Sequence, residues 1–257
     1  MLQVATWNIN SLRVRLPQVL DWLKDNPVDI LGLQETKLQD DDFPEAAFEA
    51  AGYQALYTGQ RTYNGVAVVY RDRTLVPLAT ALPGLEDPQK RLLCAADADL
   101  CLLNLYIPNG SEVGSAKYDY KLDWLAHLQR YVNSLLAEHS QLIVAGDFNI
   151  APADPDVHDP EAWRDKVLFS EPEKQAFQKL VDHGLTDCYR LFERQENEYS
   201  WWDYRTAAFR RNRGLRIDHV LASQPLAELC RACHIDKTPR ANDRPSDHAP
   251  VVASFDI

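Results

Sequence analysis

The apolar residues of this 257-residue chain gather in short runs separated by polar stretches. Each run has the length of a β-strand that is buried in a protein core, and most are bounded by turn-forming residues. The pattern therefore predicts strands at residues 2–9, 28–33, 65–70, 100–106, 141–146, 216–222 and 249–255.

Helical periodicity separates several of these runs. Residues 12–24 and 116–138 each carry a stripe of apolar positions, and Ser170 begins a third helix with the spacing of a capping box. The polar segments 107–117 and 151–169 indicate loops. Because strands and helices do not alternate strictly, we expect an α/β protein with two packed sheets and outer helices, in one domain over residues 1–257.

The composition is that of a globular protein without targeting features. Hydrophobic residues make up 46% of the chain, which is ample for a core. The N-terminus has no basic region or cleavage site, and no apolar run approaches membrane-spanning length. Five sparse cysteines suit a reducing cytoplasm, where we expect the protein. Cys230 and Cys233 form a CxxC pair without a second ligand pair, so we expect buried thiols and not a zinc site.

The net charge of −11 argues against nonspecific binding of nucleic acid, but the charge is unevenly distributed. Between residues 201 and 244 the chain carries nine Lys or Arg against five acids. A local basic surface on an acidic body can grip phosphates, although charge alone favours an ordinary solvated face.

Polar residues of catalytic type stand at the ends of several predicted strands. Asp147 and Asn149 follow one apolar run, and an extended segment points residues two apart to the same side. Asp247 and His248 precede the last run. One such ending carries little weight, but many together predict convergence on one site. The set comprises Asn8, Glu35, Tyr106, Asp147, Asn149, Asp218, Asp247 and His248.

This set favours metal-assisted hydrolysis. It lacks a Ser or Cys nucleophile with a partner base, and it is rich in hard oxygen ligands. Hard oxygens at phosphate sites select Mg²⁺ or Mn²⁺, often with only one or two carboxylates. We therefore expect one or two such ions and the attack of water on a phosphodiester.

Six short motifs surround these residues: Trp7-Asn8-Ile9-Asn10, Leu33-Gln34-Glu35-Thr36-Lys37, Tyr106-Ile107-Pro108-Asn109, Gly146-Asp147-Phe148-Asn149, Asn212-Arg213-Gly214-Leu215-Arg216-Ile217-Asp218 and Ser246-Asp247-His248-Ala249-Pro250. In sequence and order they resemble the exonuclease III family of abasic-site endonucleases, within the DNase I-like superfamily. The resemblance spans residues 7 to 250 and implies a four-layer α/β sandwich.

The resemblance also implies roles for the polar set. Glu35 is similar to the principal metal ligand, and Asp147 to the residue that positions and deprotonates the attacking water. Tyr106 and His248 resemble the groups that contact the scissile phosphate. Asp218 resembles the residue that orients His248, and Asp247 is a poorer orienter because neighbours on an extended segment point to opposite faces. The implied metal centre comprises Asn8, Glu35, Asp147, Asn149, Asp247 and His248.

The implied substrate is double-stranded DNA with abasic sites or damaged 3′ ends, bound by a monomer without a membrane or an obligate protein partner. Trp201, Leu215 and Ile217 resemble an apolar pocket for an abasic sugar, although Leu215 and Ile217 are equally compatible with a core. Ile217 and Asp218 are neighbours, so both face the site only if the strand bends there. The complete substrate-binding set is Asn109, Trp201, Trp202, Arg210, Arg211, Arg213, Leu215 and Ile217.

Two alternatives remain at this point. A superfamily relative that cleaves lipid or inositol phosphates shares the shorter motifs, and a binding module without activity shares the fold. The basic segment favours a polymer of phosphates, and no acid of the catalytic set is missing. The sequence does not rank abasic-site incision, removal of 3′ blocking groups and 3′→5′ exonuclease action, which use the same groups.

Overall fold

The computed structural model describes residues 1–192 and 197–257. Two mixed six-stranded sheets form the centre of the protein. The first sheet has the order β11-β12-β1-β2-β4-β3, with β1 (Leu2–Asn8), β2 (Ile30–Gln34), β3 (Gln54–Thr58), β4 (Val66–Tyr70), β11 (Cys230–Ile235) and β12 (Val251–Phe255). The second has the order β5-β6-β7-β8-β10-β9, with β5 (Val76–Ala79), β6 (Leu92–Ala96), β7 (Cys101–Tyr106), β8 (Leu142–Asp147), β9 (Leu185–Asp187) and β10 (Asp218–Ser223).

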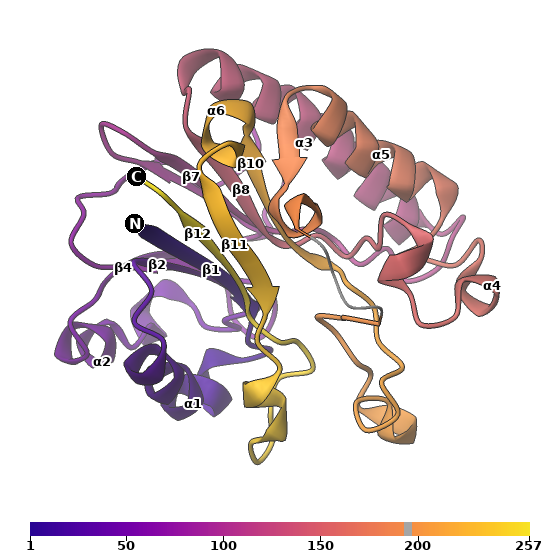
Figure 1. The fold of residues 1–257 in the computed structure, drawn as a ribbon, viewed down its shortest axis with the longest axis horizontal. Coiled ribbons are helices and arrows are strands. Elements are labelled where there is room, and N and C mark those ends of the chain that lie inside the picture. The colour runs from indigo at the N-terminus through magenta and orange to yellow at the C-terminus, as the bar shows by residue number, and fades with distance from the viewer. Residues whose placement is uncertain (193–196) are drawn as a thin grey trace.

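Helices cover the outer faces of both sheets (Figure 1). The first sheet packs against α1 (Leu12–Asp25) and α2 (Glu45–Ala50), and the second against α3 (Ala116–Glu138) and α5 (Glu171–Asp182). The connections hold the short helices α4 (Pro160–Trp163) and α6 (Gln224–Ala227), and the 3₁₀ turns η1 (Asp40–Asp42), η2 (Asp154–Asp156), η3 (Cys188–Leu191), η4 (Arg205–Ala207) and η5 (Thr238–Ala241). This is the expected four-layer sandwich. No helix within the described residues is long and apolar enough to cross a membrane.

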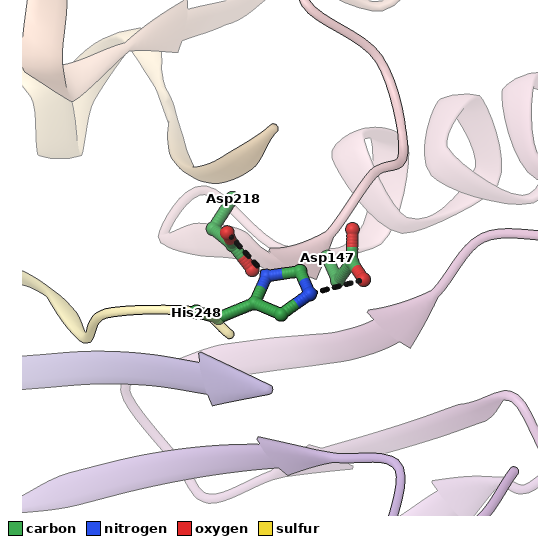
Figure 2. Close-up of side chains that lie close together, drawn as sticks. All are labelled: Asp147, Asp218 and His248. Carbon is green, nitrogen blue, oxygen red and sulfur yellow. Dashed lines mark hydrogen bonds and ion pairs between the residues drawn. The ribbon is translucent and has the colours of Figure 1, made fainter. Parts of the chain in front are cut away.

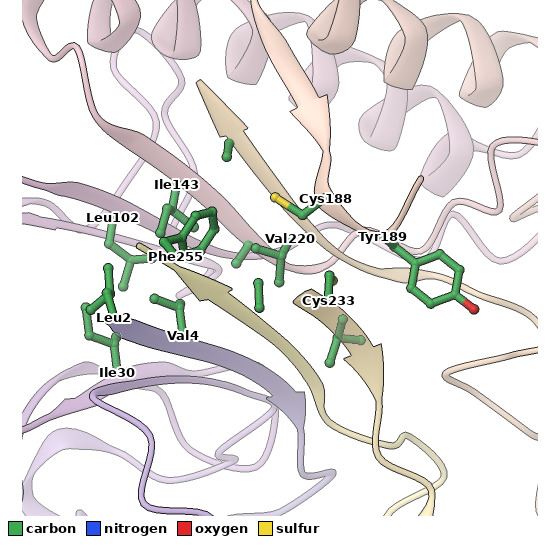
Figure 3. Packing of buried hydrophobic residues seen from close by; sticks show 14 of the residues in the cluster. Leu2, Val4, Ile30, Leu102, Ile143, Cys188, Tyr189, Val220, Cys233 and Phe255 are labelled. Atoms are coloured by element: carbon green, nitrogen blue, oxygen red, sulfur yellow. The ribbon is translucent and has the colours of Figure 1, made fainter. Parts of the chain in front are cut away.

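The inner faces of the two sheets pack against each other. Leu2 and Val4 of β1 join Ile143 of β8 and Val220 of β10 in one apolar cluster, part of which Figure 3 shows. The alternate positions, such as Ala5 and Trp7 of β1, pack against the outer helices. Each of these strands is apolar on both faces, because one face packs against the other sheet and the opposite face packs against the helices.

The inner faces become polar toward one end of the sandwich. Gln34 donates to Thr6 Oγ1 at 2.9 Å and to Asn104 Oδ1 at 2.7 Å, which joins the two sheets through buried side chains. Asn8 and Asp147 follow on the same inner-face register as the apolar residues of their strands. The polar end therefore lies at the edge where β1, β2, β7 and β8 terminate.

Most of the predicted elements are confirmed within two residues at each end. The helix predicted at 116–138 matches α3, and Glu173 accepts from the Ser170 backbone at 3.0 Å as a capping box requires. The predicted loop at 151–169 contains η2 and α4. The strands β3, β5, β6, β9 and β11 and the helices α2, α4 and α6 were not predicted; β3, β5, β9 and β11 lie at the edges of the sheets, and the three helices have at most six residues.

Candidate active site

Three strands of the second sheet present the central polar groups in register. Asp147 is the last residue of β8, and it pairs with Tyr106 at the end of parallel β7. On its other side it pairs with Asp218, the first residue of antiparallel β10. Because paired residues share a face of the sheet, the three side chains point to the same inner surface. Sheet pairing thus brings together residues that are far apart in the sequence.

The first sheet supplies the opposite wall. Asn8 ends β1 and pairs with Gln34 at the end of parallel β2, so Glu35 follows immediately at this edge. The antiparallel strand β12 runs back beside β1, which places His248, just upstream of β12, near Asn8. Trp7 Nε1 donates to the His248 carbonyl at 3.2 Å and fixes that approach.

The backbone turns sharply at the strand ends. Asn149 has a φ of 51°, and its N–H donates to Asp147 Oδ1 at 2.9 Å, so the two converge through a tight turn. The expected extended segment is wrong, although the two side chains do meet. Glu35 also has a positive φ, 51°, which re-aims a side chain that an extended strand would point outward. Gly146 must be glycine, since a Cβ there would lie 2.0 Å from the Leu105 carbonyl oxygen.

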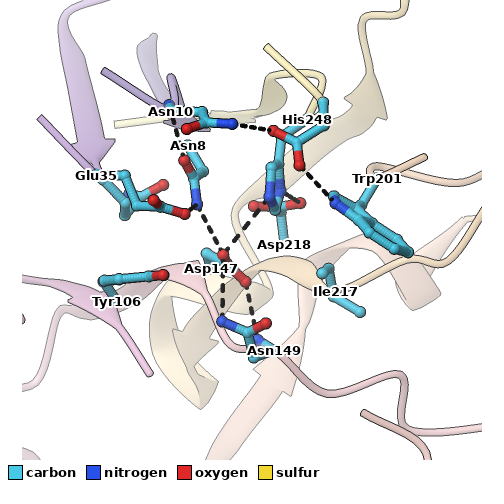
Figure 4. Close-up of polar contacts among 12 residues, drawn as sticks. Asn8, Asn10, Glu35, Tyr106, Asp147, Asn149, Trp201, Ile217, Asp218 and His248 are labelled. Carbon is cyan, nitrogen blue, oxygen red and sulfur yellow. Dashed lines mark hydrogen bonds and ion pairs between the residues drawn. The ribbon is translucent and has the colours of Figure 1, made fainter. Parts of the chain in front are cut away.

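A single amide group connects two of the carboxylates (Figure 4). Asn8 Nδ2 donates to Glu35 Oε1 and to Asp147 Oδ2, both at 2.9 Å. The other oxygen of Glu35 contacts Lys37 Nζ at 2.9 Å. Asn149 Nδ2 donates to the Ile107 carbonyl at 2.9 Å and lies 3.4 Å from Asp147 Oδ2. Asp147 is thus held by groups from both sheets.

His248 lies between two carboxylates (Figure 2). Its Nδ1 is 2.8 Å from Asp218 Oδ2, and its Nε2 is 3.7 Å from Asp147 Oδ2. Ser200 Oγ donates to the same Asp218 oxygen at 2.7 Å. The predicted pairing of Asp218 with His248 is therefore present in the structure.

Burial and neighbouring charge shift the protonation of this group in opposite directions. Burial raises the pKa of Asp147 to about 7, and the nearby His248 opposes that rise. Burial disfavours the His248 cation, but the carboxylates of Asp218 and Asp147 outweigh it and raise the pKa of His248 to about 10. At neutral pH the imidazole is therefore a cation beside a carboxyl group that titrates near neutrality.

Ligand atoms for a metal ion are present at this site. Asp147, Asp218 and His248 offer atoms that all lie within 4.8 Å of one another. A protonated His248 with Nδ1 bonded to Asp218 is a poor ligand, because ligation requires the neutral ring. Glu35 and Asp147 are the more suitable pair, since their oxygens converge on one Asn8 amide.

The remaining residues of the predicted metal set are more restricted. Asn8 turns its carbonyl oxygen to the Asn10 N–H at 3.0 Å, away from Glu35. Asp247 accepts from Asn10 Nδ2 at 2.9 Å and from Trp201 Nε1 at 3.0 Å. Burial opposes its charge, yet the positive His248 and these two donors lower the pKa of Asp247. Asp247 therefore stays ionised at the rim of the site.

The backbone bends between Ile217 and Asp218. Both N–H groups donate to Ser200 Oγ at 3.0 Å, which an extended strand cannot do because successive N–H groups alternate in direction. Ile217 and Asp218 therefore both reach the site, as the predicted bend requires. Figure 4 shows Trp201 and Ile217 on the other side of the Asp147–His248 pair from Glu35.

An apolar group adjoins the site on that side. Leu215 and Ile217 are 0% and 1% exposed, and partly exposed Trp201 packs against the cluster that contains them. Trp202 lies elsewhere. Its indole is fully buried, stacks edge-to-face on Phe209 and donates to Asn212 Oδ1 at 3.2 Å. The expectation that Trp202 touches substrate does not fit this position, since packing under the 203–213 segment occupies both its ring and its N–H.

The basic segment is only partly a surface for phosphates. Arg216 is buried in ion pairs with Asp156 at 2.6 Å and Asp187 at 2.8 Å, so its charge is already neutralised. Arg240 is also buried, and several others pair with nearby carboxylates. Among the nine basic residues between positions 201 and 244, those that are exposed and have no carboxylate partner in the structure are Arg210, Arg211, Arg213 and Arg244.

Basic side chains line two hollows on the surface, and one of these hollows reaches the site. One of about 670 Å³ is lined by Arg211 and Arg213, close in the chain to Leu215. The other, of about 630 Å³, is lined by Arg13, Arg61 and Lys37, of which Arg13 pairs with Asp42 at 3.4 Å and Lys37 contacts Glu35. This second hollow could not be predicted from the sequence, because Arg13, Lys37 and Arg61 come from separate segments of the chain. Lys37 stands inside a motif already noted, whereas a lone Ser200 gave no signal of its bond to Asp218.

Comparison with known proteins decides the family. Residues 5–248 match the Endonuclease/Exonuclease/phosphatase family, which is nearly the whole chain. The chain belongs to this family. Exodeoxyribonuclease III of Haemophilus influenzae, another nuclease, is 36% identical over 267 residues that cover 99% of this chain and all of the relative.

Solved structures of similar proteins agree with this family membership. A structure described as the 3′ phosphatase NExo from Neisseria, bound to a product DNA hairpin, superposes with a TM-score of 0.96 at 46% identity, with full coverage of both chains. An AP endonuclease from Archaeoglobus fulgidus superposes with a TM-score of 0.95 at 39% identity, again with full coverage. This family member is thus similar over its whole length to nucleases that act on DNA.

The charge arrangement predicts an unusual titration of His248. In the metal-free protein its imidazole should stay protonated to about pH 10, and Asp218→Asn should lower that pKa markedly. The pair contributes stability that is complete below about pH 6.5 and is lost as pH rises through about 10. NMR titration of the ring measures this directly, with His219 as an internal reference because burial lowers its pKa to about 4. Ordinary titration of His248 near 6.5 would contradict the assignment.

Proposed function

We propose that this protein is a metal-dependent DNA-repair phosphodiesterase that hydrolyses DNA at abasic sites, at blocked or recessed 3′ ends, or at both. The observation that carries the proposal is the convergence of Glu35, Asp147 and His248 beside the Trp201 group. A cluster of polar groups suited to hydrolysis then lies beside an apolar cluster. The similar proteins support DNA as substrate, since they are described as an exodeoxyribonuclease, a 3′ phosphatase and an AP endonuclease.

The donor set fits Mg²⁺ or Mn²⁺. Glu35 Oε1 and Asp147 Oδ2 both lie 2.9 Å from the side-chain amide of Asn8, so two hard carboxylate oxygens converge on one point. Lys37 on the second oxygen of Glu35 limits the ion to few protein ligands, which suits a cation that keeps several waters. Glu35 would hold the ion, with Asp247 at the rim. When bound, the ion supplies Lewis-acid polarisation of a phosphate oxygen.

Asp147 accepts a proton from the attacking water. In the metal-free protein, burial raises the pKa of this carboxyl above its ordinary value, which makes it a stronger proton acceptor. The N–H of Asn149 and the amide of Asn8 hold the carboxylate in one orientation, so its free lone pair is aimed. Asn149 Oδ1 accepts a hydrogen bond from Asn109 Nδ2 at 3.0 Å. This bond holds the exposed Asn109 beside the site, where it can contact substrate.

His248 provides fixed positive charge for the phosphate. Asp218 holds the ring through Nδ1, and Ser200 holds Asp218, so little reorganisation accompanies the build-up of negative charge. Tyr106 adds a neutral hydroxyl, since burial, with Glu35 and Asp147 beside it, raises the pKa of its phenol. The Arg91 guanidinium, 4.7 Å from the ring centroid, fixes the position of that ring.

DNA binding follows from the two basic hollows on an otherwise acidic body. Lys37 of the Arg13–Arg61 hollow contacts Glu35, and the Arg211–Arg213 hollow is close in the chain to Leu215. In the proposed mode of binding, a duplex at the hydrolytic centre contacts both hollows. Partly exposed Trp201 is the member of the apolar group that a sugar without a base would meet first.

A substrate panel tests the proposal. Purified protein with Mg²⁺ should cleave at least one of three duplexes, which carry an abasic site, a 3′ phosphate or a recessed undamaged 3′ end. EDTA should abolish cleavage. Inositol phosphates and sphingomyelin serve as controls for the lipid-directed alternative. Turnover of these controls without turnover of any DNA would contradict the proposal.

Asp147→Asn tests the general base. The substitution preserves shape and most hydrogen bonds, so binding of DNA should change little, while the rate falls by about 10²–10⁴-fold. Single-turnover cleavage of pre-bound DNA separates the two effects. A loss smaller than about tenfold would show that Asp147 is not the base.

Glu35→Gln tests the metal ligand. The change removes one negative charge and little volume, so activity should collapse at low Mg²⁺ and recover in part at high Mg²⁺. Glu45→Gln is the matched control, because Glu45 contacts only Tyr57 Oη, at 3.3 Å, among its described side-chain hydrogen bonds. Equal metal dependence in wild type and Glu35→Gln would exclude Glu35 as the ligand.

Neutralising Arg210, Arg211 and Arg213 together tests the DNA path. Each phosphate contact contributes a slope of roughly −0.9 in log K against log salt. The triple Gln variant should therefore bind DNA more weakly and with a flatter slope. Arg231→Gln is the control, since Arg231 already pairs with Asp256 at 3.2 Å. An unchanged slope in the triple variant would show that these arginines are ordinary solvated surface residues that do not contact DNA phosphates.

A further inference from the structure

Helix α3 carries a fully buried lysine behind the candidate site. Lys121 is 0% exposed, although lysine is among the residues least often buried. Its ammonium contacts the Asn149 carbonyl at 2.7 Å, the Asn109 carbonyl at 3.2 Å and the Glu173 carboxylate. An ammonium has three N–H donors, and each of them finds an acceptor here.

Glu173 completes the pair from helix α5. Its carboxylate accepts from Lys121, from the Leu168 N–H at 3.0 Å, and from both the N–H and the hydroxyl of Ser170. Glu173 is also 0% exposed. The buried charges are therefore paired and fully hydrogen-bonded, which is the condition under which burial of such a pair is tolerated.

The two carbonyls that Lys121 holds belong to the loops that follow β7 and β8. These loops are joined to each other at the site, because Asn109 Nδ2 donates to Asn149 Oδ1 at 3.0 Å. Asn149 has a left-handed φ of 51°, which Asn adopts more readily than most residues, and Lys121 bonds to the carbonyl of this turn. Lys121 thus holds the carbonyl of Asn149, the residue whose N–H donates to Asp147.

Stability alone does not account for this arrangement. A buried ion pair is often no more stabilising than two well-packed apolar residues. An apolar pair, however, could not hold two loop carbonyls at a common point. The ionic pair is the arrangement that links helices α3 and α5 to both loops at once.

We propose that Lys121 is a positioning residue, whose ammonium clamps the carbonyls of Asn109 and Asn149 and thereby holds the side-chain amide of Asn149 beside Asp147. The proposal rests on the proposed function only for its kinetic consequence. A misplaced catalytic group can lose about 10² in rate without loss of binding. Removal of the clamp should therefore lower kcat and leave KM nearly unchanged.

The test uses Lys121→Met combined with Glu173→Gln, which removes the clamp without leaving one buried charge alone. On the substrate that the wild type cleaves best, kcat should fall about 10²-fold with KM within about threefold. Tyr118→Phe is the matched control. It removes a 2.6 Å hydrogen bond between Tyr118 and Ser170 at the same helix junction, and this bond does not involve Asn149. This control should keep the wild-type kcat.

An epistasis measurement separates positioning from general weakening. In an Asn149→Ala background, the clamp removal should cost less than about tenfold, because the side-chain amide that it positions is already absent. Equal losses in both backgrounds would overturn the proposal. If the Lys121→Met, Glu173→Gln protein does not fold, Lys121→Arg replaces it in the same cycle, since it keeps the charge opposite Glu173 while its planar head changes the reach to the two carbonyls.

Hydrogen exchange tests the clamp without any activity. Amides of residues 107–111 and 148–152 should exchange faster in the clamp variant than in Tyr118→Phe, and equal exchange in the two proteins would overturn the proposal. If the wild type cleaved no DNA, the proposed function would fail while this measurement still decided whether Lys121 holds the loops.

Discussion

The buried carboxylate of Asp147 sets the terms for the rest of the structure. It lies with a second buried acid, Asp218, around a single imidazole, and isolated charges in a protein interior are costly. Compensation comes from His248 and from the donors of Asn8 and Asn149, which belong to both sheets. The two sheets must therefore pack in one register, because a shift would leave a buried acid without its partners.

The alternation of side chains along the strands explains why that register and the site coincide. In β1 and β8 the same inner-face positions that are apolar in the middle become Asn8 and Asp147 at the end. The sequence could predict these strands and their polar ends, because period and burial are local properties. It could not predict that Asp147 would pair with Tyr106 and Asp218, since sheet register depends on contacts between distant segments. The edge strand β5 was missed because its exposed positions lack a buried pattern.

The candidate site shows the same division between residue type and spatial arrangement. The acids, amides and His248 could be nominated from chemistry, and the resemblance to a nuclease family ordered them. The bond from Asn8 to Asp147 spans 139 positions, and no local pattern encodes it. Counting charges along the chain overstated the basic surface, because Arg216 is neutralised by Asp156 and Asp187, two acids from other segments. Net charge of a segment thus predicts a surface only after its ion pairs are known.

Contacts from outside the two sheets hold the turns that carry the site residues. Positive φ angles at Glu35 and Asn149 make both turns less favourable than ordinary backbone, so surrounding contacts must hold them. For Asn149 that support reaches through Lys121 to helices α3 and α5, which pack on the outer face of the second sheet. The helices therefore do more than cover apolar surface. Substitutions in the α3–α5 junction can alter the geometry at Asp147 without any contact with substrate, because one carbonyl links the two regions.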